Sequence, residues 1–139
     1  MRVPIPAIIV PLIVLLVYLF VPGVKEQPWT ALRTVGAILA VAAYVLFVVA
    51  RLQLGKSFAV TPQAKALVTL GFYSRIRNPI YFFVDVMWFG LTLALHLYWL
   101  FVPLPVLVVV HVLRARQEAK VLQEKFGQAY LDYRKHTWF

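Results

Sequence analysis

The end of the last long apolar segment carries a basic and an acidic side chain on one face. Arg114 and Glu118 stand four residues apart, and a helix places residues at that spacing side by side. An arginine can hold a carboxylate through two parallel hydrogen bonds, and a glutamate can pair with an ammonium group. The two residues are therefore either a solvated surface pair or the polar arms of a binding cavity. His111 lies three residues before Arg114, on roughly the same face.

Asp85 is the only acidic residue in the third apolar run of the sequence. Helical spacing puts it on one face with Tyr81 and Trp88. An acidic group inside a bilayer costs free energy unless it is paired or hydrated, so such a residue is a candidate for function. Asp85 and Trp88 are accordingly candidates for binding a substrate. The alternative is a structural hydrogen bond or ion pair between helices, with Arg77 or Arg114 as the partner.

Several kinds of chemistry have no support in the sequence. There is no glycine-rich phosphate loop and no Gly-x-Ser-x-Gly, which argues against nucleotide hydrolysis and serine hydrolysis. A lipid reductase of related helical fold stays an alternative, although the sequence has no nicotinamide-binding signature. The chain has no cysteine, and its three histidines lack a metal-ligand spacing, so we expect no metal site. Asn78 before Pro79 is a typical helix start, because Asn can cap a helix and Pro is favoured at its first position.

The composition indicates a protein surrounded by lipid. Hydrophobic residues make up 63% of the 139 residues and charged residues only 14%. A soluble domain this small could not bury so much apolar surface. The net charge of +9 would suggest nucleic acid as a partner of a soluble protein. Here the positive charges flank apolar segments, so membrane lipid is the expected partner and nucleic acid is not.

We predict one all-α integral membrane domain over residues 1–139. The apolar run 78–113 is too long for one bilayer crossing, so we expect it to form a hairpin of two helices. A C-terminal amphipathic helix over residues 116–135 should lie on the membrane surface. The predicted transmembrane helices are four, at about residues 4–23, 33–51, 79–96 and 98–115.

The distribution of lysine and arginine predicts the orientation of these helices. Basic residues are concentrated in the loop 52–78 and in the tail, so both segments and both termini should be cytoplasmic. Gly36 and Ala40 form a pair of small residues at helical spacing, a pattern compatible with a homo-oligomer.

Two segments of the sequence resemble a known family. Residues 65–81 read Lys-Ala-Leu-Val-Thr-Leu-Gly-Phe-Tyr-Ser-Arg-Ile-Arg-Asn-Pro-Ile-Tyr. They resemble the segment of isoprenylcysteine carboxyl methyltransferases that reads His-x-Leu-Val-Thr-Ser-Gly-x-Tyr and then Arg-His-Pro-x-Tyr. Residues 114–133 are similar to the C-terminal signature of that family, which has Arg, then Glu-Glu, then Phe-Gly-x-x-Tyr-x-x-Tyr. The resemblance covers about residues 52–135, and phospholipid N-methyltransferases share similar elements.

The resemblance implies a helical membrane methyltransferase that uses S-adenosylmethionine. It implies two catalytic residues, with Arg114 facing the methyl acceptor and Glu118 holding the cofactor. Arg114 then joins Asp85 and Trp88 as the expected acceptor-binding residues. The residues implied to line the cofactor site are Lys65, Ala66, Leu67, Val68, Tyr73, Asn78, Pro79, Ile80, Tyr81 and Glu118.

Three positions depart from the family pattern. Asn78 replaces the His of Arg-His-Pro, Lys65 replaces the His that opens the upstream segment, and Ala119 replaces the second Glu of the pair. Lys65 adds a positive charge near a cofactor that is itself a sulfonium cation. Ala119 removes a counter-charge. These departures are compatible with a different acceptor, weaker cofactor binding or lost activity.

Our leading hypothesis from the sequence is carboxyl O-methylation of an isoprenylcysteine-like lipid. A carboxylate acceptor needs no acid or base, because it is already a nucleophile. The alternative enzyme is a phospholipid N-methyltransferase, which would need a proton acceptor for its amine. The alternative of another class is a membrane interaction protein that keeps the fold without the cofactor.

Overall fold

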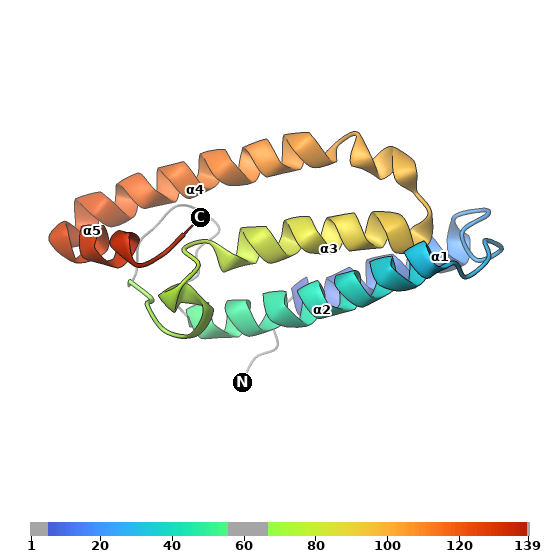
Figure 1. Cartoon of the computed structure of the whole chain (residues 1–139), viewed down its shortest axis with the longest axis horizontal. Coiled ribbons are helices and arrows are strands. Elements are labelled where there is room, and N and C mark those ends of the chain that lie inside the picture. The colour runs from blue at the N-terminus through green and yellow to red at the C-terminus, as the bar shows by residue number, and fades with distance from the viewer. Residues whose placement is uncertain (1–5, 56–66, 139) are drawn as a thin grey trace.

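The computed structural model describes residues 6–55 and 67–138. All elements of secondary structure in these residues are helices (Figure 1). The all-α prediction is confirmed for this part of the chain. Four longer helices are followed by a shorter fifth one at the C-terminal end. The elements are α1 (Pro6–Phe20), α2 (Ala31–Leu54), η2 (Gly71–Ser74), α3 (Pro79–Leu95), η3 (Tyr98–Phe101), α4 (Leu104–Phe126) and α5 (Gln128–Lys135).

Helices α2 and α3 form the most closely packed pair in the molecule. A Cβ atom added at Gly36 would lie 2.5 Å from Cβ of Leu93, and one added at Gly90 would lie 2.6 Å from the backbone nitrogen of Ala40. Small residues let two helix backbones approach this closely, which is how membrane helices commonly pack. Gly36 and Ala40, the small pair that suggested self-association, therefore pack within the chain.

The loop between α1 and α2 is organised by a buried arginine. Arg33 is only 1% exposed. Its guanidinium donates to the carbonyl oxygens of Gln27 at 2.5 Å and Val24 at 3.0 Å, and it lies over the ring of Trp29. These contacts give the loop carbonyl oxygens the hydrogen-bond donors that lipid cannot supply. They hold together the end of the bundle opposite the C-terminal helix.

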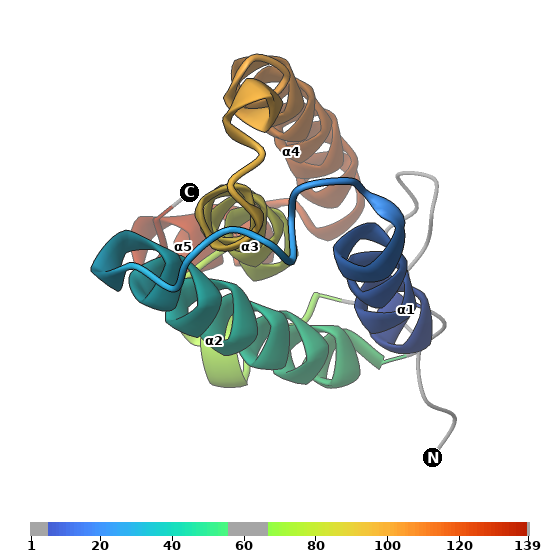
Figure 2. The same ribbon diagram turned by 90° about the vertical axis from the view of Figure 1, so that its right-hand side faces the viewer.

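Helix α4 lies on the other side of α3 from α2 and is packed much less closely (Figure 2). None of its residues is buried. The connection from α3 turns at His96, which has a positive φ of 56°, and passes through η3. The indole of Trp88 donates a hydrogen bond to the carbonyl oxygen of Leu100 at 3.0 Å and fixes this connection to α3. The helical hairpin predicted for residues 78–113 is thus present.

The lengths and surfaces of the helices are those of a membrane protein. Two helical segments, Ala31–Leu54 and Tyr98–Phe126, are long and apolar enough to cross a bilayer. Apolar side chains cover their outer faces; for example, Val41 is 64% exposed and Val106 is 65% exposed. Helices α1 and α3 are apolar but shorter. Membrane crossing by these two, and hence the count of four spans, stays a prediction.

The boundary predicted between the fourth span and the C-terminal helix is wrong. We expected one helix to end near residue 115 and another to cover 116–135, but α4 continues to Phe126. No proline or glycine interrupts the chain between Pro105 and Gly127, so nothing stops the helix earlier. The break comes at Gly127, whose φ of 51° suits glycine, and α5 follows directly.

Candidate functional site

The polar residues of α3 and α4 meet at the end of the bundle where α3 begins. Tyr81 lies in the first turn of α3, and its hydroxyl donates a hydrogen bond to Oε1 of Glu118 at 2.5 Å. The side chain of Arg114, one turn before Glu118 on α4, interacts with the same phenol. The structure thus brings together Tyr81, Arg114 and Glu118, three residues that the sequence placed at the site.

An aspartate–histidine pair continues this contact deeper between the two helices. Nδ1 of His111 lies 2.7 Å from Oδ1 of Asp85, and the two side chains are only 12% and 18% exposed. The His111 ring also stacks on Tyr81, with ring centroids 4.9 Å apart and an interplanar angle of 20°. Asp85 is therefore in contact with His111, a partner that the sequence did not suggest.

The residues Tyr81, Asp85, His111, Arg114 and Glu118 are called the polar seam below. His111 was not among the site residues expected from the sequence. A signal for it existed, because His111 lies three residues before Arg114 and seven before Glu118, which is one face of a helix. The seam combines an acid, a base, a guanidinium and an aromatic ring within one narrow strip between α3 and α4.

Tyr73 brings a buried phenol to the same end of the molecule. It lies in η2 and is 6% exposed, and its hydroxyl has no hydrogen-bond partner among the described residues. Burial raises the pKa of Tyr73 well above its usual range, and the nearby Tyr133 and Glu118 raise it further, while Arg51 opposes them. A buried donor without a partner is costly, so this hydroxyl is suited to bind a ligand.

Two side chains from distant helices hold the backbone around Tyr73. Oε1 of Gln53, at the end of α2, accepts a hydrogen bond from the backbone nitrogen of Phe72 at 2.9 Å. The hydroxyl of Tyr133 on α5 donates to the carbonyl oxygen of Tyr73 at 2.6 Å. Burial raises the pKa of Tyr133 to about 12. Sequence reasoning missed both roles; the Tyr133 position in the C-terminal signature was the available signal.

The chain after α5 returns to the mouth of the site. The backbone nitrogen of Trp138 donates to the carbonyl oxygen of Arg75 at 2.9 Å, and the nitrogen of Arg77 donates to the carbonyl oxygen of Trp138 at 3.1 Å. The Trp138 ring packs edge-on against Phe82 at 5.6 Å. The segment between η2 and α3 is therefore held by contacts with a part of the chain some sixty residues later.

The remaining predicted site residues are more scattered. Asn78 stands at the cap of α3 but makes no side-chain capping bond, contrary to expectation, and Pro79 is buried at the first position of the helix. Trp88 is bonded to the α3–α4 connection and so lies away from the seam. Lys65 and Ala66 lie outside the described residues. Ile80 packs against the buried cluster of Phe47, Ala50 and Phe83, and Leu67 and Val68 are half-buried.

The site offers charges and aromatic faces for a small cationic ligand. Glu118 supplies a carboxylate, and Tyr73 and Tyr81 supply phenols that can face a positive charge. Arg114 adds a group that binds carboxylates or phosphates bidentately. Within residues 6–55 and 67–138, no three histidine, aspartate or glutamate side chains gather as a metal site would require.

Comparison with known proteins identifies the family of the chain. The sequence profile of one family, phospholipid methyltransferase, matches residues 31–129. This match runs from the start of α2 to the first residues of α5 and contains the whole polar seam. No curated protein matches the sequence. Because the matched region is well over half of the chain, and because long apolar helices run through it, the protein is a membrane methyltransferase for lipid-like substrates and belongs to the phospholipid methyltransferase family.

Proposed function

We propose that the protein transfers a methyl group from S-adenosylmethionine to the amine of a lipid headgroup. The observation that carries this choice of acceptor is the contact between His111 and Asp85 beside Tyr81. An amine that is to be methylated must first lose a proton, whereas a carboxylate acceptor has none to lose. A histidine oriented by a carboxylate is a common proton acceptor in enzymes.

The described residues fit the cofactor in charge and in polarity. Glu118 can pair with its ammonium group, and Tyr81 can face a positive charge with its ring. The buried hydroxyl of Tyr73 has no partner within the described protein and can bond to a polar group of the cofactor. The bound cofactor would supply an electrophilic methyl group on a sulfonium, which leaves as a neutral thioether.

The other three residues of the seam then have roles toward the acceptor. Arg114 binds the headgroup phosphate through two hydrogen bonds. His111 accepts the proton that the ammonium group releases, and Asp85 orients the ring and stabilises the imidazolium that forms. The freed nitrogen lone pair forms the new N–C bond. The rest of the rate enhancement comes from two effects: the nitrogen is aligned with the methyl group, and water is excluded between α3 and α4.

The sidedness of the membrane follows from the same proposal. The start of α3, where Tyr81 contacts Glu118, lies at the same end of the bundle as α5 (Figure 1), and the bond of Tyr133 to Tyr73 places η2 there too. S-adenosylmethionine is a soluble cofactor, so this end would face the cytoplasm, as the basic residues of the loop and tail also predict.

Substitution of His111 by glutamine tests the proposal. Glutamine keeps a hydrogen bond toward Asp85 but is not a base, so methylation of a phosphoethanolamine lipid should fall by about 10²–10⁴-fold. Binding of S-adenosylmethionine, measured by calorimetry on the detergent-purified protein, should not change. Retention of amine methylation in His111→Gln would overturn the assignment. Absence of cofactor binding by the folded wild type would instead favour a non-catalytic membrane interaction protein.

A second candidate reaction is O-methylation of a carboxylate on an isoprenylcysteine-like lipid. The position of Arg114 beside Tyr81 favours it, because a guanidinium binds a carboxylate as readily as a phosphate. This reaction needs no proton acceptor. His111→Gln should therefore leave methylation of a prenylcysteine carboxylate almost unchanged, which separates the two candidates in one assay.

A further inference from the structure

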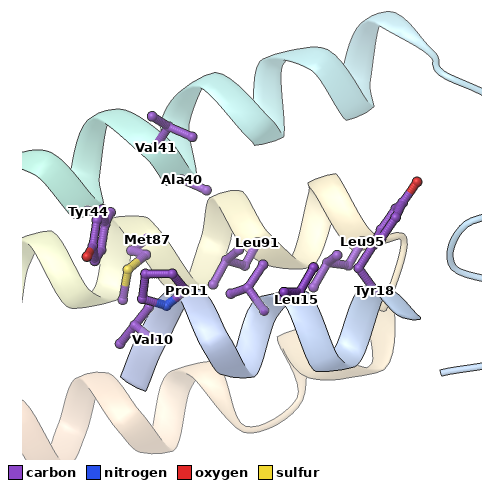
Figure 3. Close-up of a pocket in the computed structure, with 11 residues that line it drawn as sticks. Val10, Pro11, Leu15, Tyr18, Ala40, Val41, Tyr44, Met87, Leu91 and Leu95 are labelled. Atoms are coloured by element: carbon purple, nitrogen blue, oxygen red, sulfur yellow. The ribbon is translucent and has the colours of Figure 1, made fainter. Parts of the chain in front are cut away.

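An apolar cavity of about 380 Å³ lies between α1, α2 and α3 (Figure 3). Its volume is in the range of pockets that hold small ligands. Leu15 and Tyr18 of α1, Val41 and Tyr44 of α2, and Met87 and Leu91 of α3 are among its walls. This set presents almost no polar surface. Water does not fill apolar cavities, so a hydrocarbon group is the ligand that suits this one.

The cavity opens sideways, where lipid surrounds the helices. Leu15 and Val41 line it and are nevertheless 51% and 64% exposed. A hydrocarbon chain could therefore enter from the bilayer without crossing water. Since a bilayer is as apolar as the cavity, entry gains little from the hydrophobic effect, and the cavity selects a chain by its shape.

Helix α3 contributes to both the cavity and the polar seam. Met87 and Leu91 line the cavity, and Tyr81 and Asp85, nearer the start of the helix, belong to the seam. At 1.5 Å per residue, Leu91 lies about 15 Å along the helix from Tyr81. A lipid with its headgroup at the seam would have its tail at the depth of the cavity.

We propose that this cavity binds one hydrocarbon tail of the methyl acceptor while the headgroup lies at the polar seam. The assignment rests on the proposed function, since it takes the acceptor to be a lipid methylated at that seam. The wall formed by α1 precedes residue 31, where the family match begins. The match therefore covers the walls from α2 and α3 but not the α1 wall, which would give this chain its own preference among lipid tails.

A matched pair of substitutions on α2 tests the cavity. Val41 and Ile38 are 64% and 63% exposed, but Val41 lines the cavity and Ile38 does not. Val41→Trp should lower kcat/KM for a long-chain phosphoethanolamine lipid by roughly five-fold or more, as overpacking of a filled site does. Its kcat/KM for a short-chain lipid of the same headgroup, and its affinity for S-adenosylmethionine, should stay unchanged. Ile38→Trp should change none of the three, and Leu91→Trp should repeat the chain-length effect from α3.

The outcomes test the role of the cavity independently of the proposed reaction. Equal losses for long and short chains in Val41→Trp, or no loss for either, would overturn the cavity while leaving the methylation intact. If the wild type methylates neither lipid, the proposed function fails and the cavity is judged by photolabelling. A phosphoethanolamine lipid with a diazirine in its tail should label α1 and α3, and Val41→Trp should remove the label. Equal labelling by a phosphoglycerol lipid, which has no amine, would assign the cavity to bulk lipid and overturn the proposal.

Discussion

The two sides of α3 use opposite ways of joining helices. Toward α2, Gly90 lies against backbone atoms of Gly36 and Ala40, so the contact has no side chains to rearrange. Toward α4, the contact consists of long polar side chains such as Tyr81 and Glu118, and no residue of α4 is buried. Close packing on one side provides a rigid support, which leaves the other side available for chemistry. The comparison implies that stability and activity can be changed separately.

The largest effect should come from the closely packed side. Gly90→Leu places a side chain where a Cβ atom alone would lie 2.6 Å from the Ala40 nitrogen and 2.8 Å from the Gly36 carbonyl oxygen. Because both neighbours are backbone atoms, the helices must separate, and we expect a loss of about 3 kcal/mol or more in stability. Thermal unfolding in detergent measures it. Ala42→Leu, on the exposed face of α2, is the control and should have the stability of the wild type.

A substitution on the polar side of α3 should weaken cofactor binding and hardly change stability. Glu118→Gln removes a carboxylate that Tyr81 contacts and that the cofactor would pair with. Hydrogen bonds to charged groups contribute about 1.5–3 kcal/mol, so affinity for S-adenosylmethionine should fall by roughly 10- to 150-fold. Calorimetric titration checks this. A melting temperature lowered as much as in Gly90→Leu would contradict the separation of the two sides.

A smaller effect is expected where α5 meets η2. The pKa of Tyr133 is raised to about 12 in the folded protein from an ordinary value of 10. Folding thus favours the neutral phenol. Its contribution to the free energy of unfolding is complete below pH 10 and is lost as the pH rises from 10 to 12. Tyr133→Phe should lose about 1 kcal/mol at neutral pH. Unfolding measured at rising pH should show the wild type approaching the variant above pH 10, and parallel curves would contradict this role.

The smallest effect should come from the outer face of α5. Asp132 accepts a hydrogen bond from Lys135 at 2.9 Å, and this lysine lowers the pKa of the carboxyl group. Both side chains are more than half exposed. Solvent screens such pairs, so Asp132→Asn should change neither the melting temperature nor cofactor affinity measurably. A clear change in affinity would mean that α5 influences the cofactor site by a route other than the hydrogen bond of Tyr133.

The sequence was most informative about faces within one helix. The spacing of Arg114 and Glu118, and the motif ending at Tyr81, predicted residues that do meet at the end of the bundle. For Asp85 the partners considered under the structural alternative were Arg77 and Arg114, and its contact with His111 was not foreseen. Spacing shows which residues share a face, but the rotation of α4 against α3 is fixed by packing and by the connection that Trp88 holds. Asp85 itself was found because an acid in an apolar run is unusual.

Contacts between distant segments could not be predicted. Gln53 holds the backbone of Phe72 from 19 residues earlier in the chain, and Tyr133 holds that of Tyr73 from 60 residues later. Gln53 does not stand out by type or spacing, and Tyr133 stands out only as a member of the C-terminal signature. The end of α4 was misplaced because an amphipathic pattern predicts a helix on a surface but does not show where it separates from the helix before it. Gly127 was the marker of that boundary, since glycine is common where helices end.

The bond between Tyr133 and Tyr73 also has a consequence for the order in which the protein folds. It needs the chain as far as residue 133, whereas the contact of Gly36 with Gly90 needs it only as far as residue 90. During synthesis the N-terminal part of a chain can fold first, because it is complete first. The α2–α3 pair should therefore assemble first, and the candidate cofactor site should be completed only when α5 docks. Folding intermediates would be inserted in the membrane, yet unable to bind the cofactor.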